Sequence, residues 1–329
     1  MIWFKNLVLG ATMLALCVVV FGAYVRLTDA GLGCPDWPGC YGTLTVPESV
    51  AAIEKAQANY PESNIDNKKA WIEMIHRYIA AILGFIILSL AVLACRNKHE
   101  VNVKPSLVYG LLGLVIAQGM LGMWTVTELL MPIIVSLHLL GGMTTLGLLT
   151  YIAHRHWGTV SDTLISLNST SKKFIRFSLV ILFFQIFLGG WTSTNYAALA
   201  CTDFPTCHGE LIPPMDFSNG FSLWRELGLT SEGEALTLQA LQAIQWVHRV
   251  GAFIFISYFL YIIYLMSKFK SCNLYRNLLF IIIGFQFIIG ILNLLLHLPL
   301  ALATMHNLGA ALLVIITVII NSRITPKYD

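Results

Sequence analysis

Long apolar runs alternate with polar connections along the whole chain. Eight of these runs are each long enough to cross a bilayer, which takes roughly 20 residues in a helix. They lie near residues 7–27, 71–94, 106–126, 132–153, 173–194, 241–266, 277–297 and 300–320. The pattern predicts an all-α integral membrane protein with eight transmembrane helices.

The polar connections differ in charge. Lys and Arg gather in the connections 95–105, 154–172 and 267–276 and at the chain ends, whereas 28–70 and 195–240 hold most of the Asp and Glu. Basic loops stay in the cytoplasm. We therefore expect cytoplasmic N and C termini, and two long loops on the outer, periplasmic face of the plasma (inner) membrane.

Composition supports a membrane protein. The chain is 57% hydrophobic and 11% charged, whereas soluble proteins are about 25% charged. The net charge of +3 comes without a basic run, so no nucleic-acid partner is expected.

The second half of the chain repeats the first. FGAYVRLTDAGLGCPDWPGCYG (21–42) aligns without a gap with LGGWTSTNYAALACTDFPTCHG (188–209), and 118–142 aligns in the same way with 286–310. The matches include Cys, His, Gln, Gly and Pro, which chance similarity between apolar segments does not explain. Because an even number of helices keeps its orientation in the membrane, we predict two pseudo-symmetric parallel four-helix bundles, residues 1–158 and 159–329.

Four histidines occupy matching places in this repeat: His76, His138, His248 and His306. Each is predicted within the first two turns of an outside-to-inside helix. A single intramembrane histidine could serve as a polar contact between helices, but four at similar depth are functional candidates. Two imidazoles from facing helices can hold a haem iron from both sides. The pattern predicts one bis-histidine haem site in each half.

Other residues beside the histidines suit a haem. Arg77 and Arg249 each follow a histidine and are expected to pair with haem propionates, with snorkelling to the membrane surface as the alternative. Gly141 and Gly309 also match in the repeat. We expect them to let a porphyrin approach the backbone.

Each long outer loop contains two cysteines separated by five residues, Cys34 and Cys40 in CPDWPGC, and Cys201 and Cys207 in CTDFPTC. An oxidising compartment favours disulfides, so we predict the bonds Cys34–Cys40 and Cys201–Cys207. A zinc site formed by all four thiolates is the alternative. Such disulfides could staple the loops or pass electrons, and the sequence leaves both roles open.

The halves differ beside the first histidine. Glu73 precedes His76 by three residues, and Gln245 precedes His248 by three, so each lies on the same helix face as the histidine. Only a carboxylate can act as an acid or base, or stabilise a developing cation. The N-terminal half is therefore the expected site of chemistry. A plain ion pair between Glu73 and a nearby cation such as Arg77 is the alternative.

Together these residues resemble the haem A synthase family, in its cysteine-bearing subtype, over essentially the whole chain. The resemblance rests on the eight-helix repeat, the E-x-x-H-R stretch Glu73–Arg77, the other three histidines and the two cysteine pairs. It implies an oxidoreductase that converts a methyl group of haem O to the formyl group of haem A, for terminal oxidases, by successive oxidations of that methyl group.

The resemblance also assigns the histidines to two haems. His76 and His138 would hold the substrate haem O. His248 and His306 would hold a haem b cofactor. Expected partners are haem O, a haem O synthase and a membrane electron acceptor, and a homo-oligomer is one option for the assembly.

By the same resemblance, Glu73 would be essential to the oxidation, and Cys34 and Cys40 would assist it. An iron bound by two histidines has no open position for dioxygen. Either one histidine leaves, or the methyl group is oxidised by electron removal through the macrocycle, with water as the oxygen source. We favour the second route.

Two other functions explain part of the pattern. A bis-histidine membrane cytochrome that relays electrons from quinol accounts for the histidines and the repeat, but not for the difference between Glu73 and Gln245. A membrane thiol/disulfide oxidoreductase accounts for the outer cysteines and leaves four intramembrane histidines without a role. A transporter has no support beyond the helices.

Overall fold

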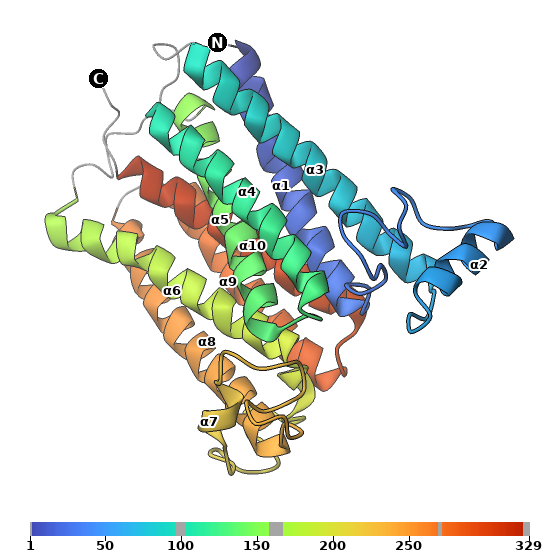
Figure 1. Cartoon of the computed structure of the whole chain (residues 1–329). Helices are drawn as coiled ribbons and strands as arrows, with labels where there is room; N and C mark the ends of the chain where they lie inside the picture. Colours follow the sequence, from blue (N-terminus) through green and yellow to red (C-terminus); the bar gives the residue numbers. More distant parts are fainter. Residues whose placement is uncertain (1, 97–102, 158–166, 269–271, 325–329) are drawn as a thin grey trace.

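The computed structural model describes residues 2–96, 103–157, 167–268 and 272–324, and the regular elements among them are helices, with no strand (Figure 1). Eight of the helices are long and apolar enough to cross a membrane. They are α1 (Ile2–Leu27), α3 (Asn67–Arg96), α4 (Pro105–Thr127), α5 (Pro132–Trp157), α6 (Ser169–Thr194), α8 (Leu238–Ser267), α9 (Asn273–Leu295) and α10 (Leu300–Arg323). The predicted all-α membrane fold is confirmed, while the predicted boundary at 158/159 lies outside the described residues.

Several helices begin before their apolar runs. Ahead of α3, the Asp66 carboxylate accepts a hydrogen bond from the Lys69 N–H (3.1 Å), and Thr237 caps α8 in the same way. Such caps satisfy backbone donors at a helix start. The placement of His76 and His248 within the first two turns is therefore wrong, because α3 and α8 gain polar turns among the outer loops.

The other two histidines fit that prediction. His138 lies six residues after Pro132, the first residue of α5, and His306 lies six residues after Leu300, the first residue of α10. Pro132 suits a first helical position because its missing N–H is not needed there. Equal spacing places both histidines roughly 9 Å along their helices, at 1.5 Å per residue.

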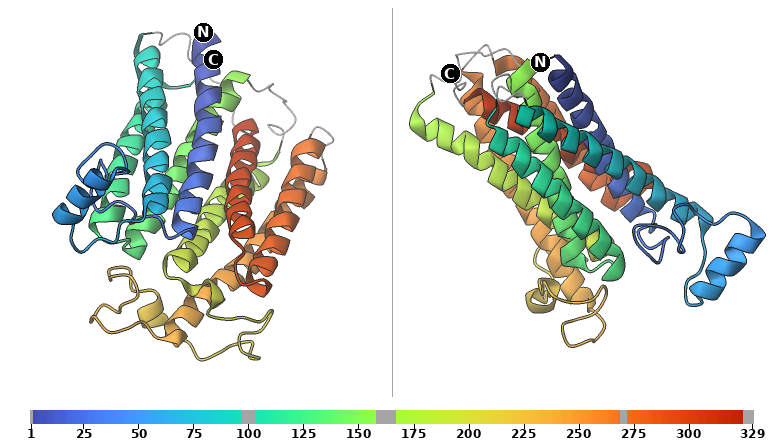
Figure 2. Two further views of the ribbon diagram at one scale, coloured as in Figure 1. Left: turned by 90° about the vertical axis from the view of Figure 1, so that its right-hand side faces the viewer. Right: turned by 45° about the horizontal axis from the view of Figure 1, so that its top comes forward.

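Helix contacts follow the same scheme in both halves (Figure 2). In the first half, α1 and α4 each contact α3 and α5. In the second half, α6 and α9 each contact α8 and α10. The halves meet through α1 with α10, α5 with α10, and α5 with α6. Buried apolar residues from all eight spans form one continuous core, so the two halves are packed as one body.

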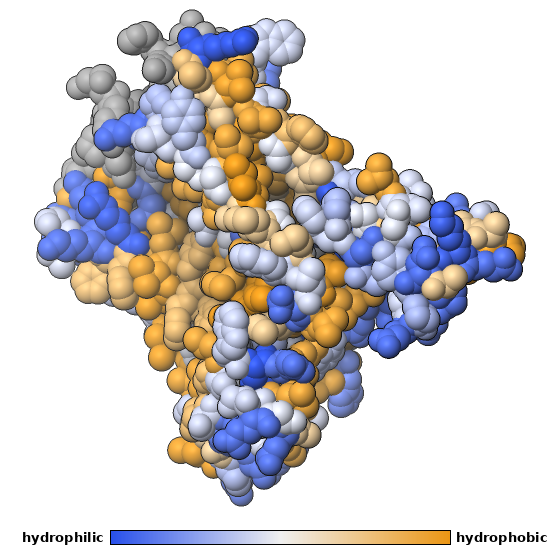
Figure 3. All heavy atoms as spheres, viewed as in Figure 1, coloured by the Kyte–Doolittle hydropathy of each residue, from blue (hydrophilic) through white to orange (hydrophobic). Residues whose placement is uncertain are grey.

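Both long loops lie at the end of the molecule opposite the start of α1 and the end of α10 (Figures 1 and 2). They contain the short helices α2 (Val50–Asn59), η1 (Ala197–Leu199) and α7 (Phe217–Gly220), which hydropathy did not predict. Apolar side chains cover the spans, and polar ones gather on the loops (Figure 3). This distribution is that of an integral membrane protein.

The loops repeat in backbone conformation as well as in sequence. Outside glycine, the described residues with positive φ form four pairs of repeat counterparts, with φ between 47° and 61°: Asp29 and Tyr196, Tyr41 and His208, Leu129 and His297, and Leu130 and Leu298. This region is uncommon for non-glycine residues. Three of the pairs differ in residue type, so the turns have kept their shape while their side chains changed.

A polar contact joins the halves at the end of the molecule where the two long loops lie. The Arg26 guanidinium pairs with Asp29 (3.2 Å) and donates to the Ser193 carbonyl oxygen (2.6 Å). The Tyr196 hydroxyl donates to Asp29 (2.7 Å), and the Tyr196 ring lies 4.0 Å below the Arg26 guanidinium. This arrangement connects the end of α1 to the turn after α6.

Trp191 of α6 is fully buried and connects the second long loop, between α6 and α8, to the bundle. Its indole N–H donates to the Gly220 carbonyl oxygen at 2.9 Å, and its ring packs in a cluster with Ala197 and Ile244. One side chain thus provides both apolar burial and a hydrogen bond to the loop.

Trp191→Ala should lower the free energy of unfolding by about 3–5 kcal/mol, the usual cost of deleting a buried aromatic side chain. Thermal unfolding in detergent measures the change. Trp224→Ala is the control, because Trp224 is 74% exposed on the same loop. Equal unfolding midpoints for the two variants would contradict this account of Trp191.

Candidate functional site

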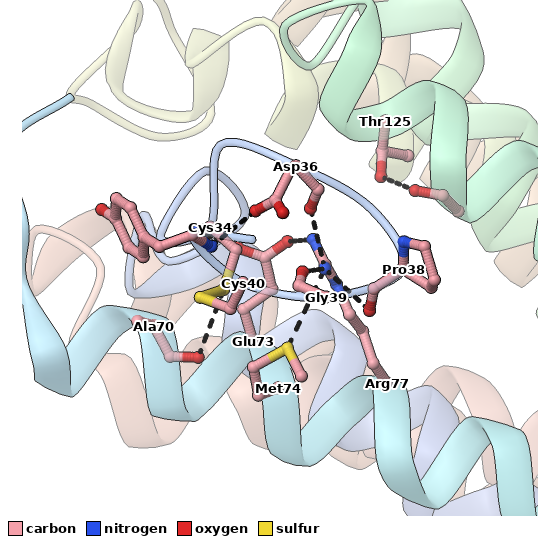
Figure 4. Close-up of polar contacts among 12 residues, drawn as sticks. Cys34, Asp36, Pro38, Gly39, Cys40, Ala70, Glu73, Met74, Arg77 and Thr125 are labelled. Atoms are coloured by element: carbon pink, nitrogen blue, oxygen red, sulfur yellow. Dashed lines mark hydrogen bonds and ion pairs between the residues drawn. A yellow bond between two sulfur atoms is a disulfide. The ribbon is translucent and has the colours of Figure 1, made fainter. Parts of the chain in front are cut away.

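The first long loop, between α1 and α3, is docked on α3 through Glu73 (Figure 4). The Cys34 backbone N–H donates to Glu73 Oε2 at 2.9 Å, and Arg77 Nη2 pairs with Glu73 Oε1 at 2.5 Å. Glu73 is only 4% exposed. Its carboxylate is therefore held between a loop N–H and a cation one helical turn away.

Arg77 holds the turn of this loop. Its Nη1 donates to the carbonyl oxygens of Asp36 (2.9 Å) and Gly39 (2.5 Å), with that of Pro38 at 3.4 Å. Both of its terminal nitrogens thus contact the loop or Glu73. Pairing of Arg77 with a haem propionate stays a prediction.

Both predicted disulfides are present, Cys34–Cys40 and Cys201–Cys207. The alternative of a zinc site is wrong, since the four sulfur atoms are paired, and no group of three or more His, Cys, Asp or Glu in the described ranges could hold a metal. Cys34 and Cys40 are 0% exposed. The first disulfide is thus a buried staple in the loop that contacts Glu73.

An aspartate shapes each disulfide loop, and sequence reasoning gave it no role. Asp36 accepts hydrogen bonds from the backbone N–H groups of Tyr41 (2.6 Å) and Gly42 (2.8 Å). Asp203 accepts the equivalent bonds in the second loop. Hydrogen bonds lower the pKa of the Asp203 carboxyl, the one from the Thr206 hydroxyl most and those from these N–H groups less. The match of Asp36 with Asp203 in the repeat was the available signal.

The second loop is docked in the same way without a negative charge. Gln245 Oε1 accepts from the Cys201 N–H at 2.5 Å, and its Nε2 donates to the Ala198 and Cys201 carbonyl oxygens. Arg249 donates to the carbonyl oxygens of Thr206 (2.7 Å) and Cys201 (3.0 Å). An amide is therefore sufficient to dock a loop of this kind.

The four histidines form two pairs, one in each half. His76 of α3 and His138 of α5 are close enough to interact electrostatically, and so are His248 of α8 and His306 of α10. This is the pairing that the repeat predicted. All four side chains lie in the spans and are partly buried.

Each imidazole rests against a glycine of a neighbouring helix. Glycine has no Cβ, so we measure the closeness of the contact as the distance from imidazole Cε1 to the position that a Cβ would occupy if the glycine were replaced by alanine. The pairs are Gly22 with His76 (2.9 Å), Gly122 with His138 (3.5 Å), Gly189 with His248 (3.2 Å) and Gly290 with His306 (3.4 Å). Gly22 matches Gly189, and Gly122 matches Gly290. Small residues thus set the helix spacing at all four rings.

Gly141 and Gly309 do not leave the open space expected of them. A Cβ on Gly141 would overlap the Gln118 amide, and one on Gly309 would lie 2.9 Å from Gln286 Oε1. These glycines accommodate glutamines from α4 and α9. The matches of glycine and glutamine in the repeat thus have one structural cause.

The histidines fit a haem. Among the described residues, the buried Nδ1 atoms of His76, His138 and His306 have no hydrogen-bond partner. Buried polar atoms are normally paired, so an imidazole that served only as a polar contact would use its nitrogens in hydrogen bonds. Paired imidazoles seated on glycines, three of them with an unpaired Nδ1, are suitable axial ligands for a haem iron.

Residues 5–318 match a family described as cytochrome oxidase assembly protein. A protein of Shewanella oneidensis named "Heme A synthase" is 40% identical over 322 residues, which cover 97% of this chain and 95% of that protein. The chain belongs to the haem A synthase family of cytochrome oxidase assembly proteins.

More distant members of the haem A synthase family align over most of the chain as well. A "Heme A synthase" of Agrobacterium fabrum is 27% identical over 325 residues, covering 91% of this chain and 84% of that protein. One of Chelativorans sp. is 29% identical over 315 residues, covering 88% and 82%. The resemblance read from the sequence is confirmed, and it extends over both halves.

Gly22→Ala should disturb the first histidine pair, because the added Cβ would lie 2.9 Å from His76 Cε1. Loss of ligand support typically costs about 10–100-fold in metal affinity or activity. We expect haem A formation to fall by at least about tenfold, measured by chromatography of extracted haems. Gly10→Ala, on the same helix with open space at Gly10, is the control. Equal product from the two variants would count against the glycine contact.

Proposed function

We propose that this chain is an enzyme that oxidises a methyl group of haem O to the formyl group of haem A, for use in terminal oxidases. With water as the oxygen source, the change at the substrate carbon is –CH3 + H2O → –CHO + 4 H+ + 4 e−. Family membership and the names of the relatives support this activity. The observation that carries the site assignment is the carboxylate at Glu73, where the equivalent contact in the other half uses an amide.

The two halves would hold different haems. We assign substrate haem O to His76 and His138 in the N-terminal half (1–158). We assign haem b to His248 and His306 in the C-terminal half (159–329). The proximity of the two rings in each half and their glycine contacts support two bis-histidine sites. A haem b held by His248 and His306 would supply one-electron redox chemistry.

Glu73 would act on the substrate as the catalytic carboxylate. Gln245 shows that an amide docks the loop, so the negative charge is not needed for docking. A buried carboxylate can accept protons released from the methyl carbon, or stabilise positive charge that develops on it. Arg77, paired with Glu73, keeps the carboxylate oriented toward the loop.

Cys34 and Cys40 would assist by position. Their disulfide closes the loop whose Cys34 N–H holds Glu73 Oε2. Both cysteines are buried, which favours the stapling role over direct electron transfer in this arrangement. We place the disulfide loops on the outer, periplasmic face of the plasma membrane, where oxidation of thiols is favoured. A haem O synthase would supply the substrate, and a membrane electron acceptor would take up the electrons released by its oxidation.

Production of haem A tests the activity directly. The chain is expressed in a host that makes haem O but no haem A, and the membrane haems are extracted and chromatographed. We expect haem A and its hydroxymethyl precursor. If haem b copurifies with the protein while the membranes contain no haem A, the chain is a bis-histidine cytochrome and the proposal fails.

Glu73→Gln should separate loop docking from chemistry, because Gln245 already makes the equivalent bond. General acid–base groups contribute about 10²–10⁴-fold, so product should fall by at least about 100-fold while bound haem and unfolding temperature stay near wild type. Glu48→Gln is the matched control, since Glu48 lies on the same loop and accepts a bond from the Trp71 indole of α3. Full activity of Glu73→Gln would remove Glu73 from the chemistry.

A further inference from the structure

The first histidine of the C-terminal half has a hydrogen-bond partner that its counterpart lacks. Gln185 of α6 places its Nε2 3.1 Å from His248 Nδ1 and 3.2 Å from the His248 carbonyl oxygen. In the other half, the buried Nδ1 of His76 has no partner among the described residues. The repeat aligns Gln185 with Val18, which has no hydrogen-bonding group.

A second change accompanies this one. Gln185 Oε1 would lie 2.5 Å from a Cβ placed on Gly251, so the amide fits only because residue 251 is a glycine. Aligning His248 with His76 pairs Gly251 with Ile79. The C-terminal half thus has both the glutamine and the space for it, and the N-terminal half has neither.

The amide suits the protonation that a haem ligand needs. A neutral imidazole that binds iron through Nε2 carries its proton on Nδ1, and this N–H is normally fixed by an outer acceptor. Gln185 Oε1 is buried and has no donor among the described residues. Turning the amide over would place Oε1 toward Nδ1. The His248 carbonyl loses little, because it lies inside α8 where helix bonds are available.

We propose that Gln185 is a positioning residue for His248, which fixes the imidazole ring and directs its Nε2 to the haem iron, so that the C-terminal half holds its haem tightly. This inference rests on the proposed function. The N-terminal half, with Val18 at this place, holds its haem less tightly, as suits a substrate that must leave. Gln185 acts through His248 and is not itself a catalytic residue.

Gln185→Leu tests the inference on the purified full-length protein. Removing an outer partner of a metal-bound histidine costs about 10–100-fold in affinity. We expect haem b to transfer about 10–100-fold faster to an excess of a haem-scavenging protein. The midpoint potential should also rise, because a ligand with a bonded Nδ1–H is the stronger electron donor and favours ferric iron. Gln185→Glu retains an acceptor, so haem retention should stay near wild type and the midpoint potential should not rise, because a carboxylate accepts the N–H at least as strongly as the amide oxygen does.

Gln286→Leu is the matched control. Gln286 is a glutamine of the same half, and it donates to the His306 backbone carbonyl and not to the ring. Its loss should leave the midpoint potential near wild type. Equal haem loss in Gln185→Leu and Gln286→Leu, with no change in potential, would reduce Gln185 to a packing residue and overturn the inference.

A gain-of-function variant covers the case in which Gln185→Leu does not fold. Val18→Gln combined with Ile79→Gly builds the same contact beside His76. More haem O or haem A should then copurify with the protein, and product release should slow. Unchanged retention by this variant would overturn the inference.

The outcomes also separate this inference from the proposed function. Suppose that haem b copurifies with wild-type protein and is lost from His306→Ala. If Gln185→Leu then behaves as wild type, only the proposed role of Gln185 is wrong. If wild-type protein holds no haem that depends on His306, the assignment of haem b to this half fails, and the inference fails with it.

Discussion

One hydrogen bond in each half docks a disulfide loop on the helix that carries the first histidine of that half. The N–H of the first loop cysteine donates to a side chain three residues before a histidine, Cys34 to Glu73 and Cys201 to Gln245. A buried backbone N–H needs a partner within the protein, and these bonds supply one for Cys34 and Cys201, which are both fully buried. They also fix each disulfide loop beside its histidine, with an arginine holding the nearby carbonyl oxygens.

The halves share a frame and differ in the groups that act on a ligand. Glycines set the ring positions equally in both halves. The charge at Glu73 and the amide of Gln185 each occur in only one half. Glu73 suits proton transfer on a bound substrate, and Gln185 suits long-term retention of a cofactor. We propose that these two changes on one repeated frame distinguish a reactive site from a redox site.

Hydropathy predicted the spans because each is apolar over its full membrane depth, and the repeat predicted the histidine pairs and disulfides. Helix starts such as Asn67 were missed because capped polar turns carry no hydropathy signal. The contacts of Gly22 with His76 and of Gln185 with His248 join residues more than 50 positions apart. A single sequence does not indicate which helix faces meet. The sequence suggested that Arg77 was available to bind a ligand. Its partners are backbone carbonyl oxygens, which every residue has, so residue types could not reveal them.

The contact between the ends of α1 and α6 also bears on how such a chain arises by duplication. Asp29 meets Tyr196, and Arg26 meets Ser193, and each pair consists of repeat counterparts. In a two-fold arrangement a residue touches its own counterpart only near the axis. Two identical N-terminal halves would oppose Asp29 to Asp29 and Arg26 to Arg26, with like charges facing each other. Divergence here makes each half prefer the other to a copy of itself.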